Sequence, residues 1–237
     1  MIVSISQPAY LPWLGYFDRI ARSDLHIVLD TVQMERNTRT SFTNRNRVRT
    51  ACGPVWLTVP VKRPASPDEA LIGNALIDGP HWARKHWQTL VQSYARAPHF
   101  RDLGARLEPV YRRDWQRLEA LLAETTALLL DALGLGARLV RSSDLGVRSR
   151  KSALVLDLCR AVGASCYLSG PFGRDYLDLG SFAGAGIEVR FHDYAHPVYP
   201  QIHGGFEPFM SVVDLVFNCG PASLAILRGG DHGKGCP

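Results

Sequence analysis

The sequence has little of what a secreted or membrane protein needs. Its five cysteines are odd in number and include no C-x-x-C pair, which argues against a disulfide scaffold and predicts free thiols in a reducing cytoplasm. No apolar run reaches about 20 residues, the length of a membrane span. The opening MIVSISQPAY has neither a basic n-region nor a small-residue cleavage site, so we expect no signal peptide.

Short motifs of several large enzyme classes are missing as well. There is no G-x-G-x-x-G dinucleotide fingerprint, no Walker loop, no H-E-x-x-H zinc motif and no G-x-S-x-G elbow of a serine hydrolase. Three histidines lie between His192 and His203, close to Asp193 and Glu207. Pro197 nevertheless opposes the helix on which an H-x-x-x-H pair could bind a metal. We therefore expect no metal site.

The composition is that of an ordinary globular protein, with 46% hydrophobic and 21% charged residues. The 237 residues fit one domain, or one domain with an elaborated insert. A net charge of +5 favours acidic partners such as a phosphate-bearing cofactor, a nucleotide-sugar, an acidic carrier protein or RNA, without selecting among them. Neither DNA nor a membrane is indicated as a partner.

The stretch QPAYLPWLGY, from Gln7 to Tyr16, organises the start of the chain. A buried strand is predicted before it, at Ile2 to Ile5, and its two prolines favour a loop from Gln7 to Pro12. A helical pattern follows, and a second strand begins at His26. In open α/β sheets, ligands bind where such loops leave the carboxyl ends of strands. We therefore interpret this loop as one wall of a binding site, although a rigid turn packed by aromatic residues would read the same way.

Strand and helix patterns alternate along the rest of the chain. Apolar runs predict strands at 26–29, 55–59, 138–140, 166–169 and 187–191, with a further candidate at 71–77, and helical periods predict helices at 82–94, 114–133 and 151–162. The alternation predicts an α/β fold with a mainly parallel, Rossmann-like sheet, flanking helices and a helical insert at about 80–134. We expect a single domain over residues 1–228 and a flexible tail over 229–237.

The segment from Thr31 to Thr50 is polar and basic, with few apolar anchors. We expect an ordered loop or a short hairpin there. Its dense part is Asn44-Arg45-Asn46-Arg47, in which each arginine can bind a phosphate or carboxylate with two N–H groups and each asparagine offers donors and an acceptor. A solvated basic loop explains the same run equally well.

Two later stretches carry candidate chemistry. The loop from Gly170 to Gly173 can admit a ligand close to the backbone, where amides bind anions. In the turn after the last predicted strand, a histidine near Asp193 is either a general base or a hydrogen-bonded structural group. Cys219 is either a nucleophile, with His196 or His203 as its base, or a small buried residue.

Several motifs occur together in an order that resembles the WbqC-like protein family. They are QPAYLPWLGYF, NRNR followed by WLTVPVK, KHW, YARAPHF, RSSDLG, YLSGPFGRDYL, AGIEV, HPVYPQ and FEPFMSVVDLVFNCG. The resemblance extends to about Leu227. The chain departs from the family's KRSWQNRNR-like run, where it has MERNTRTSFTNRNR with Phe42 at the aromatic position.

The resemblance implies an enzyme: an acyl or aminoacyl (for example glycyl) transferase that acts on an amine acceptor in bacterial polysaccharide or specialised-metabolite biosynthesis. The implied partners are a small-molecule amine acceptor and, as donor, an acyl carrier protein or aminoacyl-tRNA. No cofactor is implied beyond that thioester or aminoacyl-tRNA donor. The resemblance brings no catalytic mechanism with it.

The residues themselves suggest roles in such a transfer. An amine acceptor needs a base and donors for the developing oxyanion. We expect His196 as base, with Asp193 or Asp30 as alternatives. The candidate oxyanion donors are Asn44, Asn218 and the backbone amides around Gly170. The candidate substrate-binding residues are Gln7, Tyr10, Trp13, Tyr16, Gln33, Asn44, Arg45, Asn46, Arg47, Lys62, Lys85, Ser143, Ser169, Gly170, Tyr176, Tyr199 and Gln201.

Two other functions stay open at this point. The first strand, its P-x-L-G turn and the following helix are similar to the H-x-G-H region of class I nucleotidyltransferases, which suggests an adenylate-forming or nucleotidyl-transfer enzyme. Trp13 and Tyr16 stand at the positions of the phosphate-binding histidines, so the similarity supports the fold more than the activity. The other alternative is a non-catalytic module that binds an intermediate or recruits a partner enzyme.

Overall fold

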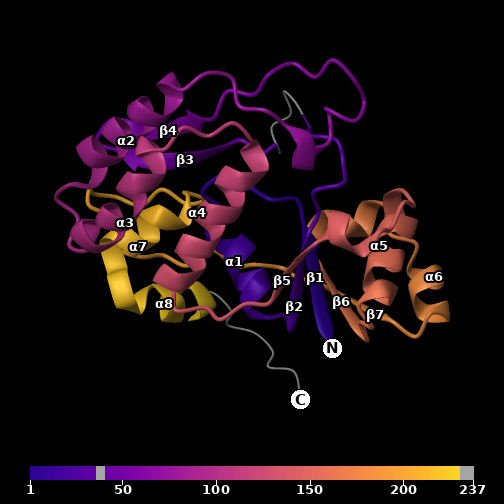
Figure 1. Ribbon diagram of the computed structural model, residues 1–237. Coiled ribbons are helices and arrows are strands. Elements are labelled where there is room, and N and C mark those ends of the chain that lie inside the picture. The colour runs from indigo at the N-terminus through magenta and orange to yellow at the C-terminus, as the bar shows by residue number, and fades with distance from the viewer. Residues whose placement is uncertain (36–40, 230–237) are drawn as a thin grey trace.

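A computed structural model of the chain describes residues 1–35 and 41–229 (Figure 1). Its centre is a parallel sheet with the strand order β5-β2-β1-β6-β7. The strands are β1 (Ile2–Ser6), β2 (Leu25–Val28), β5 (Leu139–Arg141), β6 (Cys166–Ser169) and β7 (Glu188–Phe191). The predicted α/β fold with a mainly parallel, Rossmann-like sheet is confirmed.

The central strand β1 separates two kinds of side chain because successive residues of a strand point to opposite faces. Val3 and Ile5 belong to a core formed with α5 (Lys151–Ala161) and α6 (Leu179–Gly184). Ser4 pairs in register with His26 of β2. The alternation in IVSIS therefore places the serines of β1 on the opposite, polar side of the sheet.

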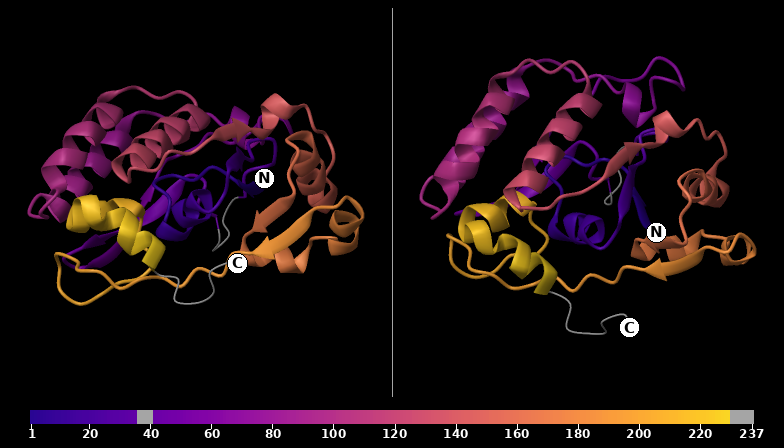
Figure 2. Two further views of the ribbon diagram at one scale, coloured as in Figure 1. Left: turned by 90° about the horizontal axis from the view of Figure 1, so that it is seen from below. Right: turned by 60° about the horizontal axis from the view of Figure 1, so that its bottom comes forward.

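A larger core lies on that other side. Helix α1 (Leu14–Ala21) covers the polar face, with Leu14, Phe17 and Ile20 directed into this core. Around α1 gather the hairpin of β3 (Arg45–Thr50) and β4 (Gly53–Thr58) and the helices α2 (His81–Tyr94), α3 (Phe100–Arg112), α4 (Leu118–Ala132), α7 (Val212–Cys219) and α8 (Ser223–Gly229). Figure 2 shows these helices on one side of the sheet, with α5 and α6 on the other.

Some local predictions are corrected. Residues 71–77 are a single 3-10 turn, Ile72–Asn74, flanked by isolated bridges, because no continuous strand runs beside them. The helix expected from residue 114 begins at Leu118. Helices α3, α6 and α8 were not predicted. Gly229, where we placed the start of a flexible tail, ends α8, and residues 230–237 of that prediction lie outside the described residues.

One stretch of the described chain, Val212–Gly229, is long and apolar enough to cross a bilayer by composition alone. Half of it is buried inside the molecule, and Gly220, with φ of 50° and ψ of −125°, interrupts it between α7 and α8. Core helices pass the same test of length and composition, so this stretch is weak evidence for a membrane span.

Candidate functional site

The strand order reverses between β1 and β6, because the chain leaves β1 toward β2 and later returns to the other side of β1. In open α/β sheets, ligands bind outside the carboxyl ends of the strands at such a switch point. A cavity of about 500 Å³ lies there, and we call it the switch-point pocket. The predicted substrate-binding residues that line it are Gln7, Trp13, Arg47, Ser169, Gly170 and Tyr176.

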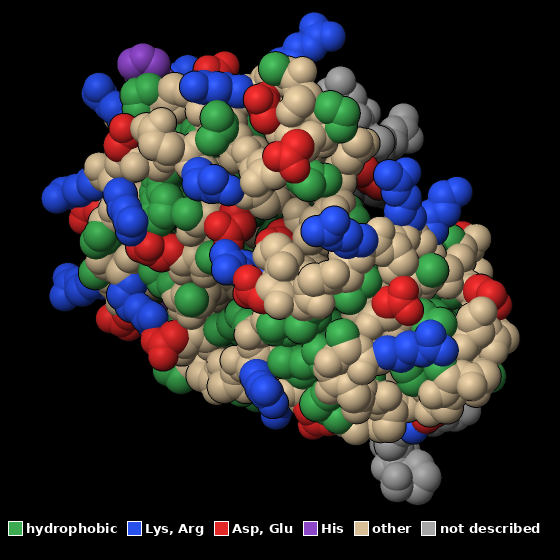
Figure 3. Space-filling view, turned by 45° about the vertical axis from the view of Figure 1, so that its right-hand side comes forward, with side chains coloured by type: hydrophobic (Ala, Val, Ile, Leu, Met, Phe, Trp, Pro, Cys, Tyr) green, Lys and Arg blue, Asp and Glu red, His purple; other side chains and the backbone are tan. Residues whose placement is uncertain are grey.

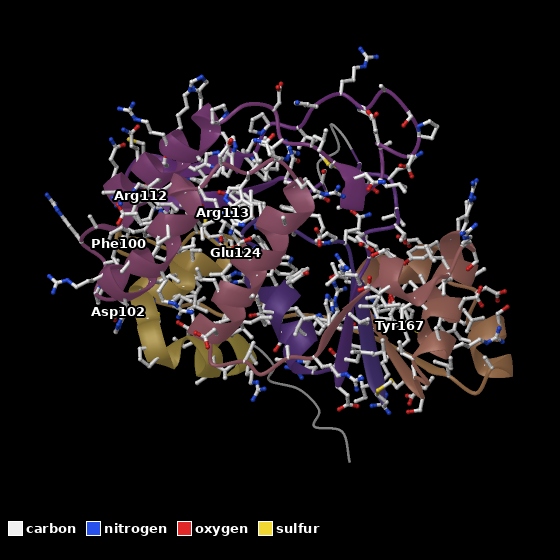
Figure 4. The ribbon with its side chains drawn as sticks, viewed as in Figure 1. Phe100, Asp102, Arg112, Arg113, Glu124 and Tyr167 are labelled. Carbon is white, nitrogen blue, oxygen red and sulfur yellow. The ribbon has the colours of Figure 1, made fainter. Side chains whose placement is uncertain are left out.

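Segments far apart in the sequence meet in this pocket. The first loop contributes Gln7 and Trp13, the arginine–asparagine segment contributes Arg47, and the late turn contributes Phe209. Tyr167 of β6 also lines the pocket, and Figure 4 labels it near α5. The mouth has an exposed aromatic rim, since Phe172, Tyr176 and Phe209 are each at least half exposed.

Ser6 lines the pocket at the carboxyl end of β1 and contacts a buried histidine. The Oγ atom of Ser6 lies 3.0 Å from Nε2 of His26, which is 1% exposed. The other ring nitrogen, Nδ1, lies 2.7 Å from Oγ of Ser4, and Ser4 in turn lies 2.7 Å from Oγ of Ser23. A nucleophile beside a base that a third group orients is the general arrangement of nucleophilic catalysis.

One arrangement of the hydroxyl protons gives His26 the tautomer of a base. In it the Ser23 hydroxyl donates to the carbonyls of Arg19 and Ile20, each 3.0 Å away, and Ser23 Oγ accepts the hydrogen bond from Ser4. Ser4 Oγ has then given its only proton and accepts from Nδ1–H of His26. Nε2 therefore carries the lone pair, and the Ser6 hydroxyl donates to it. This is the tautomer that a base acting on Ser6 requires.

His26 is an uncharged imidazole at physiological pH. Burial, and then the positive charge of Arg19, lower its pKa from 6.5 to about 3. A neutral ring keeps Nε2 available to accept a proton from Ser6. Tyr16 packs edge-on against the His26 ring and is hydrogen-bonded to Ser6, so two buried groups, His26 and Tyr16, hold the serine in place.

Gln7 follows Ser6 at the wall of the pocket. Its Oε1 atom accepts a hydrogen bond of 3.3 Å from Thr43. Among the residues that the structure describes, no acceptor is bonded to the Gln7 side-chain amide NH₂. Gln7 thus offers two donors in the pocket that Ser6 also lines.

Arg19 reaches the pocket from α1 and packs against the backbone at Gly170. A side-chain carbon at Gly170 would collide with Nη1 of Arg19, so the loop after β6 needs glycine for this close approach. The Arg47 guanidinium, from β3, makes a long hydrogen bond, 3.5 Å, to the carbonyl of Phe209 and lies 5.7 Å from the centre of the Trp56 ring. The pocket is therefore lined by two cations.

A second cavity, of about 720 Å³, lies farther along the same edge of the sheet, near the start of α5. It contains two predicted substrate-binding residues, Gln33 and Ser143, and the basic residues Arg148, Arg150 and Lys151. The structure thus separates the predicted site residues into two cavities.

Asp30, an alternative base in our prediction, is saturated by hydrogen bonds. It accepts from the Ser142 hydroxyl at 2.7 Å, from the Ser143 backbone N–H at 2.9 Å and from the Ser143 hydroxyl at 2.6 Å. These bonds fasten the end of β2 to the turn after β5. Asp30 therefore positions the walls of the second cavity and has no lone pair directed at the Ser6 hydroxyl.

The predicted base His196 is also engaged at both ring nitrogens. Nδ1 donates to the carbonyl of Pro197 at 2.9 Å, and Nε2 accepts from the Phe209 backbone N–H at 3.2 Å. Burial lowers its pKa. Asp193 is exposed and forms a two-pronged ion pair with Arg174, at 2.9 and 2.7 Å. These residues shape the turn that carries Phe209 into the pocket.

The predicted residues Asn218, Tyr199 and Gln201 surround the buried Asp214 on α7. Tyr199 and Gln201 each donate to Asp214 at 2.8 Å, and Asn218 donates to the Asp214 carbonyl at 2.7 Å. Tyr94 completes the network at 2.7 Å. Burial raises the pKa of Asp214. The network anchors the late turn on α7, away from the pocket.

The remaining predicted substrate-binding residues serve the fold around the pocket. Asn44 and Asn46 donate to the carbonyls of Val59 and Leu11, at 2.8 and 2.7 Å. The others are Tyr10, buried against His86 and Tyr111; Tyr16, packed on His26; Arg45, stacked on Trp56; Lys62, just past β4; and Lys85, exposed on α2. Among them only Tyr16 touches the serine–histidine group.

Neither a metal nor a cysteine nucleophile is supported in the described residues. No group of three His, Cys, Asp or Glu side chains there could hold a metal ion. Burial, and then the charge of Asp214, raise the pKa of Cys219, which disfavours the thiolate. His203 is bonded to the carbonyl of Ser93 at 2.8 Å.

Our reading of the sequence missed Ser6, His26 and Arg19. One signal was present: the alternation Val3-Ser4-Ile5-Ser6 places two hydroxyls on the same face of a buried strand. A buried strand that keeps polar residues on one face needs partners for them. The partner, His26, could be found only by pairing β1 with β2.

Comparisons with known proteins agree with the motifs. A model of the WbqC-like protein family matches residues 7–226. The chain is 37% identical over 228 residues to a protein of Mycobacterium tuberculosis (strain ATCC 25618 / H37Rv) described as "Uncharacterized protein Rv1507c", with 95% of this chain and 97% of that protein covered. No solved structure matches the chain. The chain belongs to the WbqC-like protein family.

Proposed function

We propose that this protein is an acyl or aminoacyl transferase that acts on an amine acceptor, with Ser6 as its nucleophile and His26 as the base. The observation that carries the proposal is the chain of hydrogen bonds Ser6–His26–Ser4–Ser23, which, with Ser23 donating to the backbone, leaves the lone pair of Nε2 on the Ser6 hydroxyl. The family resemblance in the sequence motifs supports the same reaction class in bacterial polysaccharide or specialised-metabolite biosynthesis.

The transfer has two balanced steps. In the first, Ser6 Oγ attacks the activated carbonyl carbon while Nε2 of His26 takes the hydroxyl proton; the donor's leaving group departs with that proton, and an acyl ester forms on Ser6. In the second, the amine attacks the ester carbon and His26 takes a proton from it. The proton returns to Ser6 as the ester bond breaks, and the product is an amide.

Each step passes through a tetrahedral intermediate with a negatively charged oxygen. Gln7 and Ser6 line the same pocket, and the side-chain amide of Gln7 has donors to offer that oxygen. Gln7 replaces Asn218 as our candidate oxyanion donor, because both polar atoms of the Asn218 side chain are bonded within the fold.

Acyl thioesters and aminoacyl-tRNA are cytoplasmic donors, and we place the reaction in that compartment. The free thiols of Cys52, Cys159 and Cys219 are consistent with a reducing environment. A carrier protein or tRNA would approach from the exposed aromatic rim, since the pocket opens between Phe172 and Phe209.

The test is to trap the acyl group. The purified protein is mixed with a glycyl or acetyl thioester of N-acetylcysteamine, and its mass is measured before and after addition of hydroxylamine as the amine. We expect an acyl adduct on Ser6 that hydroxylamine removes as a hydroxamate. Ser6→Ala should form no adduct, and His26→Gln should form it about 10²- to 10⁴-fold more slowly.

Ser66→Ala is the matched control. Ser66 is exposed, does not line the pocket and accepts a hydrogen bond from the Glu69 backbone N–H at 3.2 Å. It should leave the adduct unchanged. An adduct that survives in Ser6→Ala would remove the proposed nucleophile. A wild-type protein that binds the thioester yet never reacts would favour a binding module, and release of pyrophosphate from ATP would favour the nucleotide-using alternative.

A further inference from the structure

Arg19 combines burial with the lack of a counter-ion. Its Nε atom is buried and has no hydrogen-bond partner, and no carboxylate pairs with its guanidinium within residues 1–35 and 41–229. The Nε atom of Arg49 is buried without a partner as well, but the Arg49 guanidinium pairs with Glu207 at 3.3 Å. Three residues farther along the same helix, Arg22 bonds the buried Asp18 at 2.6 Å. Arg113 likewise pairs with Glu124 at 2.9 Å on the helical side of the molecule (Figure 4).

The surface around it shows the usual mixture of charges. Over the face drawn in Figure 3, Lys and Arg side chains lie among Asp and Glu side chains. The switch-point pocket differs, because the described residues that line it include Arg19 and Arg47 but no aspartate or glutamate. A guanidinium in such a place loses hydration without gaining a counter-ion, which is unfavourable until an anion binds.

The positive charge of Arg19 affects the pKa values of four neighbouring side chains. Burial lowers the pKa of His26 and raises the pKa of Tyr16, Tyr167 and Tyr176. The positive charge of Arg19 adds to the lowering for His26 and opposes the rise for the three tyrosines. These four side chains come from different elements around the end of β1. Arg19 therefore lies at the centre of a poorly screened positive field.

We propose that the switch-point pocket binds its substrate through an anionic group, a carboxylate or a phosphate ester, held by the guanidinium of Arg19. The planar fork of an arginine matches both anions with paired N–H donors. The site deepens the proposed function and rests on it, since it names the chemical class of the substrate that occupies the same pocket.

The position of Arg19 also links binding to reactivity. While the pocket is empty, the arginine adds to burial in keeping His26 a weak base. An anion on Arg19 cancels much of that positive field and makes Nε2 more basic at the moment when the substrate lies beside Ser6. Arg47 supplies further positive charge from the opposite wall.

The test measures binding without chemistry. Inorganic phosphate and N-acetylglycine are titrated separately into Ser6→Ala, which cannot form the ester, and into the wild type. The arginine Nε–H signals are followed by NMR. We expect saturable binding of at least one probe, with equal affinity in both proteins and with the largest shift at the buried Nε–H of Arg19. Binding of phosphate alone indicates a phosphate ester, and binding of N-acetylglycine alone indicates a carboxylate.

Variants of the arginine complete the test. Arg19→Lys keeps the positive charge but loses the paired N–H donors of the guanidinium, and Arg19→Met loses both. We expect the affinity for the anionic probe to be at least tenfold weaker in each variant. Arg160→Gln, an exposed arginine of α5 that lies 3.7 Å from Asp157, is the matched control and should bind like the wild type. Binding of neither probe to the wild type, or undiminished binding in a folded Arg19→Lys, would overturn the anion site.

The two proposals fail in different ways. If Ser6 is not a nucleophile, the thioester leaves no adduct, yet the anion still binds. If Arg19 is not the anion site, the adduct on Ser6 still forms while phosphate and N-acetylglycine leave the Nε–H signals unmoved.

Discussion

At the scale of single residues, the serine–histidine group is held by buried hydroxyls where many hydrolases use a carboxylate. Ser4 orients His26 through Nδ1 at 2.7 Å, and no aspartate or glutamate of the described residues is bonded to the ring. A neutral orienting group stabilises an imidazolium less than a carboxylate would. His26 is therefore a base whose strength depends on the charges that enter the pocket.

The buried histidines also predict how stability changes with pH. Burial lowers the pKa of His26 to about 3, with help from Arg19, and that of His86 to about 4. The unfolded chain binds a proton on each ring near pH 6.5, whereas the folded chain does not. The stability that these rings contribute is fully present above pH 6.5 and is lost as the pH falls from there toward 4 and 3.

We therefore expect the free energy of unfolding to fall by about 2 kcal/mol for each of the two rings between pH 7 and pH 5. Urea unfolding at the two pH values measures the change. In His26→Asn and in His86→Asn, one ring is removed, so each variant should show a correspondingly smaller fall. An equal fall in the wild type and both variants would contradict the assignment.

At the scale of elements, the loop after β6 has a defined task. Gly170 adopts an ordinary extended conformation, with φ of −68° and ψ of 166°, so alanine fits its backbone. The only close neighbours of an added Cβ belong to the guanidinium of Arg19, the far end of a flexible side chain. The substitution should therefore displace Arg19 without disturbing the sheet.

For Gly170→Ala we expect a melting temperature within a few degrees of the wild type, because the backbone is unstrained. Anion binding should weaken about tenfold, since a displaced fork loses one charge-assisted hydrogen bond. The NMR titration and a thermal melt measure the two effects. Gly184→Ala, in α6 with open space around the added carbon, is the control and should change neither.

Strands and helices were predicted correctly where the apolar pattern that indicates them lies within a single segment of the sequence. The strands β1, β2 and β6 and the helices α2, α4 and α5 follow from apolar periods within single segments. Helix α3 escaped prediction because Pro109 lies inside it and glycine and charged residues dilute its apolar stripe. The strand predicted at residues 71–77 was wrong because alternating apolar residues form a strand only when a neighbouring strand runs beside them.

At the scale of the whole molecule, the parallel sheet explains which of the predicted site residues meet in the switch-point pocket and which do not. The loop that carries Gln7 and Trp13 was placed at the pocket because parallel strands direct their carboxyl ends to one edge. His26 was missed because its contact with Ser6 depends on the register of β1 against β2. Asn46 and Tyr199 do not line this pocket. Polar side chains that tie loops together look like ligand contacts in a sequence.

The charges of the pocket also affect which acceptors react. Two arginines and no acidic residue among the described lining residues disfavour an ammonium ion. We expect kcat/KM for an amine to rise with pH through the acceptor's own pKa. Weakly basic amines such as hydroxylamine should react at neutral pH, whereas a simple alkylamine should need alkaline solution. A stopped assay of amide formation at several pH values checks this, and a preference for the alkylamine at neutral pH would contradict it.

Because no described residue that lines the pocket is an aspartate or glutamate, the pocket selects amine nucleophiles by their protonation state. A protonated amino group is repelled at the mouth of the pocket. The neutral amine, which is the nucleophilic form, can enter. Discrimination between lysine-like amines, which are abundant in any cell, and the less basic amino groups of sugars would then require no dedicated recognition of the sugar ring.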